Sequence, residues 1–154
     1  PNDPDPHCRG GGGMEAENAD DWEALARDKL EASRIRLASR KWKQAYHHAG
    51  IAAECALKCK IMRVHGMNRW PEKRERRDVY THDIEELTEI AGLMDGINAA
   101  LLESLRPPHI DGWLIIKDWN INLRYHVPDA FPQAVAESAV SAIDAMGLVQ
   151  WLLK

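Results

Sequence analysis

The chain of 154 residues contains no apolar run that approaches the roughly 18 residues needed to span a membrane. Its N-terminus also lacks the charged-then-apolar pattern of a secretory signal. Hydrophobic residues make up 45% of the sequence and charged residues 29%, which is a globular composition. We therefore expect one domain with its own core, located in the cytoplasm and without a membrane partner.

Cysteine is scarce, with Cys8 in a polar tail and Cys55 and Cys59 four residues apart. An odd and small number of cysteines argues against a disulfide framework. Cys55 and Cys59 would share one helix face and supply half of a zinc site, but no second cysteine pair exists to complete it. We interpret both as buried, reduced thiols, and we expect neither a metal nor another cofactor.

An excess of positive charge is also missing, because the net charge is -4. Contact with nucleic acid would therefore have to come from a local patch. The basic stretch between residues 63 and 77 is the best candidate, and Trp70 and Tyr80 are placed to stack on bases beside it. A solvated loop is the alternative interpretation, since acidic residues dilute the charge. The basic residues are Arg63, Arg69, Lys73, Arg74, Arg76 and Arg77, and the acidic ones are Glu72, Glu75 and Asp78.

No segment alternates apolar and polar residues for long enough to predict a strand. Helical periodicity instead predicts an all-α, up-and-down bundle of four or five helices. Asp20 and Glu23 resemble a capping box, Thr81 is expected to cap the third helix, and residues 66–80 look too charged to bury. The expected helices cover about 21–39, 42–65, 81–91, 97–105 and 133–153, with a short helix or turn near 112–118 and an extended passage over 120–132.

The first 13 residues, "PNDPDPHCRGGGG", are rich in proline, glycine and polar side chains. Such a segment cannot bury apolar surface, so we expect a disordered tail, either a leader or an added remnant. Its glycine run is no phosphate loop, because no strand precedes it and no Lys-Ser/Thr follows it. The predicted helical domain covers residues 14–154.

Three blocks occur in order along the chain: "AYHHAGIAAECALKCKI" at 45–61, "YTHDIEEL" at 80–87 and "LRYHVPD" at 123–129. On a five-helix pattern they resemble the HEPN domain, a small helical domain found in prokaryotes beside nucleotidyltransferases. The resemblance covers about Asp20 to Lys154. It implies an up-and-down helical bundle that usually forms a homodimer.

The resemblance also implies two broad roles. Some HEPN proteins resemble metal-independent RNA-cleaving toxins, whose Arg-x(4–6)-His site is duplicated across a dimer cleft. Others bind nucleotides or act as partners of a minimal nucleotidyltransferase in toxin–antitoxin pairs, where the enzyme can modify the HEPN subunit with nucleotides. In the nucleases the motif lies near the start of the last long helix. Here that place carries Arg124, Tyr125 and His126, whereas the spaced pair is Arg77 and His82.

RNA cleavage through the 2′-hydroxyl needs a proton acceptor and a cation for the developing negative charge. His82 fits the first need and Arg77 the second, with Asp78 orienting Arg77 and no metal required. Arg-x4-His also arises by chance where a basic loop leads into a helix. His82 would then pack at the helix start and bond a carboxylate or carbonyl group. A nuclease site, a nucleotide-binding corner and a structural contact therefore remain open.

Glu54 and Lys58 form an i,i+4 pair on the second predicted helix. Because Glu54 lies among alanines, we expect it to be partly buried in an internal network, where it meets His82 or Arg124. Arg124 either ties its loop to helix ends or offers a guanidinium to a phosphate. The candidate nucleotide- or RNA-binding residues are Arg74, Arg76, Tyr80, Arg124 and Tyr125.

The leading hypothesis is a HEPN-domain protein that binds nucleotide or RNA. It would act with a nucleotidyltransferase partner in a toxin–antitoxin or defence system. The alternatives are a metal-independent endoribonuclease toxin that uses Arg77 and His82, and a non-catalytic dimerisation module.

Overall fold

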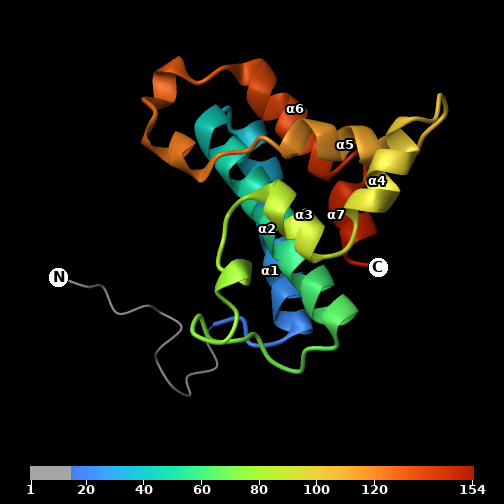
Figure 1. Ribbon diagram of the computed structural model, residues 1–154. Coiled ribbons are helices and arrows are strands. Elements are labelled where there is room, and N and C mark those ends of the chain that lie inside the picture. The colour runs from blue at the N-terminus through green and yellow to red at the C-terminus, as the bar shows by residue number, and fades with distance from the viewer. Residues whose placement is uncertain (1–14) are drawn as a thin grey trace.

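The computed structural model describes residues 15–154, except for the side chains of Arg124 and Asp129. The expected disorder of residues 1–13 therefore lies outside the described residues. α-Helices and short 3₁₀ helices are the regular elements of the described chain, and no strand occurs within it (Figure 1). The prediction of an all-α helical bundle is confirmed. None of the helices in this part of the chain has the combination of length and hydropathy that crossing a membrane requires.

Helices α1 (Ala19–Ala38) and α2 (Trp42–His65) form a long antiparallel pair (Figure 1). The side chain of Asn18 accepts a hydrogen bond from the Asp21 amide at 2.9 Å, and Asp21 accepts one from the Asn18 amide at 3.3 Å. This reciprocal pair is a capping box, so the predicted cap at Asp20 and Glu23 was wrong by two residues. At the other end of the pair, α2 stops at Gly66, whose φ of 63° suits glycine.

The small side chains of α2 allow neighbouring elements to approach closely. Ala45, Ala49, Ala52 and Ala56 have no exposed surface. A Cβ atom at Gly50 would overlap the indole ring of Trp119, so the segment after α5 lies directly on the α2 backbone. The absence of a side chain at Gly50 therefore positions this segment.

Helix α3 (Ile84–Ile90) begins three residues after Thr81. Its cap is Asp83, whose carboxylate accepts from the Glu86 amide at 3.0 Å. Thr81 was therefore wrongly predicted as the cap, and its hydroxyl instead accepts from the Asp83 amide at 3.1 Å. Asp83 caps α3 in place of Thr81 because its negative carboxylate is stabilised at the positive end of the helix dipole.

The remaining helices differ from the prediction at their ends. Helix α4 (Met94–Leu101) begins and ends earlier than predicted. Helix α5 (Pro108–Ile116) starts at a proline, which is tolerated because the first helical position needs no amide hydrogen. The predicted last helix is two helices, α6 (Gln133–Ile143) and α7 (Leu148–Leu152), separated at Gly147, where φ is 81°. The expected extended passage contains the 3₁₀ helices η3 (Ile121–Tyr125) and η4 (Pro128–Ala130).

The connection over residues 66–80 is attached to the core, although its charge predicted a fully solvated loop. Trp70 is only 8% exposed, and its ring meets that of Trp22 edge-on with centroids 5.0 Å apart. Val79 in the short helix η2 (Arg77–Val79) is completely buried. The prediction that Trp70 stacks on bases was therefore wrong, because apolar contacts with α1 and α2 hold its ring inside the protein.

Candidate functional site

A buried ion pair with a histidine beside it lies at the middle of α2. Glu54 is 5% exposed and Lys58, one turn later, is 7% exposed. The Glu54 carboxylate receives a hydrogen bond from Lys58 Nζ at 3.1 Å on one oxygen and contacts Nδ1 of His82 at 2.6 Å through the other. These contacts join Glu54, Lys58 and His82 in one internal network. The side chain of Arg124, the other expected partner, lies outside the described part of the structure.

Two tryptophans from different segments enclose the Lys58 ammonium group. Its nitrogen lies 5.2 Å from the ring centre of Trp22 on α1 and 5.7 Å from that of Trp70 in the 66–80 connection. The negative faces of the indole rings attract the cation at these distances. Burial of Lys58 is tolerated because the rings and the Glu54 carboxylate replace the water it has lost.

The charge state of Glu54 follows from opposing effects. Burial by itself raises the pKa of Glu54, but the hydrogen bond with His82 and the nearby charge of Lys58 outweigh it. The resulting pKa lies below the usual value for a glutamate. Glu54 is therefore ionised at neutral pH and acts as a hydrogen-bond acceptor on both oxygens.

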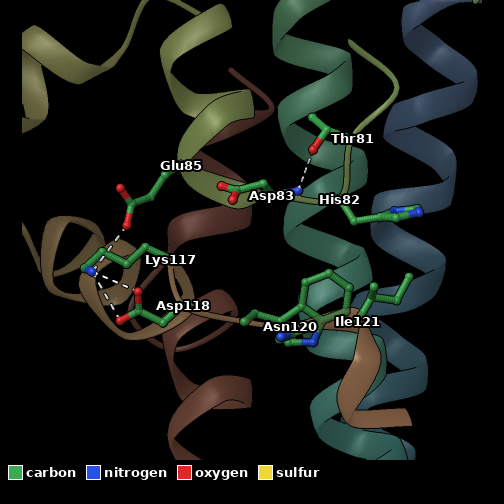
Figure 2. Close-up of a pocket in the computed structure, with 9 residues that line it drawn as sticks. Thr81, His82, Asp83, Glu85, Lys117, Asp118, Asn120 and Ile121 are labelled. Atoms are coloured by element: carbon green, nitrogen blue, oxygen red, sulfur yellow. Dashed lines mark hydrogen bonds and ion pairs between the residues drawn. The ribbon is translucent and has the colours of Figure 1, made fainter. Parts of the chain in front are cut away.

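This acceptor determines the tautomer of His82. An ionised carboxylate cannot donate, so the proton of the neutral imidazole resides on Nδ1, and Nε2 carries the lone pair. The side chain of His82 is 56% exposed, and the ring extends away from the Lys117–Asp118 pair (Figure 2). A histidine oriented by a carboxylate, with a basic nitrogen open to solvent, is arranged as a general base. The same contact also satisfies a buried carboxylate, which is a purely structural role.

An open cleft of about 440 Å³ lies beside His82 (Figure 2). Lys117 bridges two of its walls, with Nζ 3.4 Å from Glu85 at the start of α3 and 3.0 Å from Asp118 after α5. Asp83 adds a third carboxylate, so acidic side chains outnumber the basic one. The cleft suits groups that donate hydrogen bonds. Its lining residues are Thr81, His82, Asp83, Glu85, Lys117, Asp118, Trp119, Asn120 and Ile121.

Arg77 lies five residues before His82 but outside the lining of this cleft. It is exposed at the start of η2. Asp78 does not orient it, because its carboxylate binds the guanidinium of Arg76 through two hydrogen bonds of 2.9 and 2.8 Å. This pairing holds the pKa of Asp78 below its usual value. The predicted Asp78–Arg77 contact was wrong, since Arg76 offers the same carboxylate a two-pronged arrangement.

The basic stretch from Arg63 to Arg77 is largely neutralised within the protein. Arg69 pairs with Glu75 at 3.0 Å, and Arg74 pairs with Glu72 at 2.6 Å. The hydroxyl of Tyr80 donates to the Pro71 carbonyl at 2.6 Å. The acidic residues of this connection therefore serve as local partners for its arginines, which weakens it as an anion-binding surface.

The other candidate binding residues lie in η3. The side chain of Arg124 is outside the described part of the structure. Tyr125 is largely exposed. Across residues 15–154, no three histidine, cysteine, aspartate or glutamate side chains form a group that could hold a metal ion. Cys55 and Cys59 are buried free thiols, as predicted, and burial raises the pKa of Cys55 to about 12.

No family model matches this chain, and a search of curated proteins finds no match either. Among solved structures, the crystal structure of an archaeal HEPN homologue matches with a TM-score of 0.54. The match covers 89% of this chain and 98% of that one. The fold is HEPN-like. At 16% sequence identity the similarity concerns the fold of this HEPN-like chain alone, so its site has to be argued from its own residues.

The sequence did not reveal two features of this site. The tryptophans around Lys58 come from distant segments, and no local pattern connects them. Likewise, Lys117 and Asp118 were interpreted only as the end of a short helix. The i,i+4 spacing of Glu54 and Lys58 within a run of alanines was the useful signal.

Proposed function

We propose that this HEPN-like chain binds a nucleotide or RNA as a cytoplasmic homodimer, together with a nucleotidyltransferase partner in a toxin–antitoxin or defence system. The observation that carries the proposal is the orientation of His82 by the buried, ionised Glu54 through Nδ1, while the His82 side chain as a whole is 56% exposed. The partner and the biological setting follow from the resemblance to HEPN domains.

The charges around His82 indicate how such a ligand would lie. Asp83, Glu85 and Asp118 would repel a phosphate placed within the cleft. They would accept hydrogen bonds from ribose hydroxyls and from the exocyclic amines of bases. The phosphate would then lie outside the cleft toward Arg77, which the chain places within about 18 Å of His82.

Ligand-dependent thermal stability tests this proposal. ATP, GTP and a short single-stranded RNA are each added to the wild type, His82→Gln, and Arg27→Gln as an exposed control. A ligand at a hundredfold over its Kd stabilises the fold by about 2.7 kcal/mol, which raises the Tm by several degrees. We expect this increase in the wild type and the control but not in His82→Gln. An unchanged Tm of the wild type with all three ligands would overturn this proposal, and it is the result that a non-catalytic dimerisation module predicts.

The exposed Nε2 of His82 favours a second candidate, metal-independent endoribonuclease activity. His82 would remove the proton from a 2′-hydroxyl, whose oxygen then attacks the adjacent phosphorus. The bond to the 5′-oxygen breaks, and that oxygen takes up a proton, leaving a 2′,3′-cyclic phosphate and a 5′-hydroxyl. Arg77 would stabilise the negative charge on the phosphoryl oxygens, from the same chain or across a dimer.

This activity is tested with end-labelled RNA in the presence of EDTA. We expect the wild type to produce fragments with 5′-hydroxyl ends, and His82→Ala to produce none. A substrate with a single 2′-deoxy substitution at the cleavage position should not be cleaved, because it lacks the attacking hydroxyl. Intact RNA after incubation with the unmodified wild type would rule out the nuclease while leaving ligand binding open.

A further inference from the structure

The turn between α1 and α2 carries a local excess of positive charge, although the protein as a whole is acidic. No aspartate or glutamate occurs from residue 32 to residue 53. The same segment contains five basic residues: Arg34, Arg36, Arg40, Lys41 and Lys43. This local excess of positive charge is what an anionic polymer requires.

The basic side chains of this turn remain available, in contrast to those of the 66–80 connection. Arg36, Arg40 and Lys41 are exposed. Within residues 15–154, no carboxylate forms an ion pair with any of them, whereas Arg34 is held by Asp144 at 2.5 Å. The positive charge of Arg36 also acts on its surroundings: burial lowers the pKa of His48, and the charges of Lys29 and Arg36 lower it further.

The turn itself is well ordered by its backbone hydrogen bonds. The Arg40 amide donates to the Leu37 carbonyl at 3.0 Å, and the Lys41 amide donates to that of Arg36 at 2.9 Å. Arg40 adopts a left-handed conformation with φ of 59°, and its guanidinium lies 5.9 Å from the ring centre of Trp42. The positive groups are therefore presented by a fixed turn rather than by a flexible arm.

The side of α2 that leads from this turn toward Glu54 is covered by the chain itself. Trp119 lies over Gly50, and its ring is 6.2 Å from that of His47. Glu54 is only 5% exposed. A ligand held here would therefore contact the turn and not this side of the helix.

We propose that the α1–α2 turn binds the phosphate backbone of an RNA through the exposed side chains of Arg36, Arg40 and Lys41. The inference rests on the proposed function and specifies RNA, rather than a free nucleotide, as its ligand. The turn and η3 lie at the same end of the molecule (Figure 1), so η3 borders this site.

Fluorescence anisotropy with a labelled 12-nucleotide RNA tests the inference. The turn variant combines Arg36→Gln, Arg40→Gln and Lys41→Gln. The control variant combines Arg27→Gln, Lys60→Gln and Lys154→Gln, which remove the same charge elsewhere. We expect the turn variant to bind at least tenfold more weakly than the wild type, and the control less than threefold. The slope of log K against log salt should fall by roughly 0.7 for each lost phosphate contact, about 2 in total.

The outcomes separate this inference from the proposed function. RNA binding by the turn variant at wild-type strength overturns the inference while the proposed function stands. Equal weakening of both variants also overturns it, because the effect would reflect net charge alone. A wild type that binds ATP or GTP but not RNA overturns the inference only. A wild type that binds neither nucleotides nor RNA overturns both.

Discussion

Glu54 and Lys58 are joined by a 3.1 Å hydrogen bond within α2, and both side chains are almost fully buried. Removing Glu54 leaves the Lys58 ammonium group buried with only the two tryptophan rings to stabilise its charge. We expect Glu54→Ala to lower the free energy of unfolding by about 3–5 kcal/mol. The variant Glu54→Gln/Lys58→Met should lose less than the sum of its single changes. Urea denaturation of the wild type, Glu54→Ala, Glu54→Gln, Lys58→Met and the double variant measures both effects.

The exposed pair of Glu23 and Arg27 supplies a matched control for this cycle. It has the same i,i+4 spacing and a distance of 3.3 Å. Its coupling free energy should be only about 0.3–0.5 kcal/mol. A coupling between Glu54 and Lys58 as small as that of the exposed pair would contradict the role assigned to burial.

Trp119 can reach α2 only because residue 50 is a glycine. In Gly50→Ala the new Cβ would overlap the indole ring, so the segment after α5 must move. We expect a loss of about 1–3 kcal/mol in the free energy of unfolding. Gly96→Ala is the control, because Gly96 is also helical but has open space around it, and this change should stabilise by about 0.5–1 kcal/mol. Similar effects of the two substitutions would show that Trp119 does not depend on Gly50.

Local signals predicted the fold better than they predicted the site. The end of α2 was readable because Gly66 acts within one turn of the helix. The apolar periodicity of residues 133–153 predicted one helix, but a left-handed Gly147 divides it while both halves stay packed. Periodicity reports which face is buried, and it does not report a change of direction.

Contacts between distant segments explain the remaining differences. Arg-x4-His spacing suggested that Arg77, Asp78 and His82 act together. The structure instead pairs Asp78 with Arg76 and His82 with Glu54, which is 28 residues earlier. Trp70 appeared to belong to a solvated loop because its neighbours are charged. Trp70 is buried because it contacts Trp22 and Lys58, which are distant in the sequence. The residues next to Trp70 give no sign of these contacts.

Acid should weaken the fold through its paired carboxylates. The hydrogen bond from Arg34 lowers the pKa of Asp144, which has a value of about 3.8 when unperturbed. A lowered folded-state pKa contributes stability above the unfolded-state value, and this stability is lost as pH falls through the folded-state value. We expect Asp144→Asn to reduce the slope of unfolding free energy against pH below about pH 5.

At neutral pH the same substitution should cost no more than about 1 kcal/mol, because the Arg34–Asp144 pair is partly exposed. Chemical denaturation at a series of pH values measures both quantities. Asp28→Asn removes an exposed carboxylate for which no pairing is described and serves as the control. An unchanged pH slope in Asp144→Asn would show that this pair does not contribute to acid sensitivity.

Thr88 connects α3 to α5 through a fully buried hydroxyl group. It donates to the Ile84 carbonyl at 2.6 Å and accepts from Nε1 of Trp113 at 3.0 Å. Thr88→Val keeps the shape but leaves the indole N–H of Trp113 buried without an acceptor. We expect a loss of about 1–3 kcal/mol in the free energy of unfolding, measured by urea denaturation. Thr81→Val removes a hydroxyl that accepts from a backbone amide near the surface, where water replaces it, so its cost should be smaller. A larger loss in Thr81→Val than in Thr88→Val would contradict this assignment.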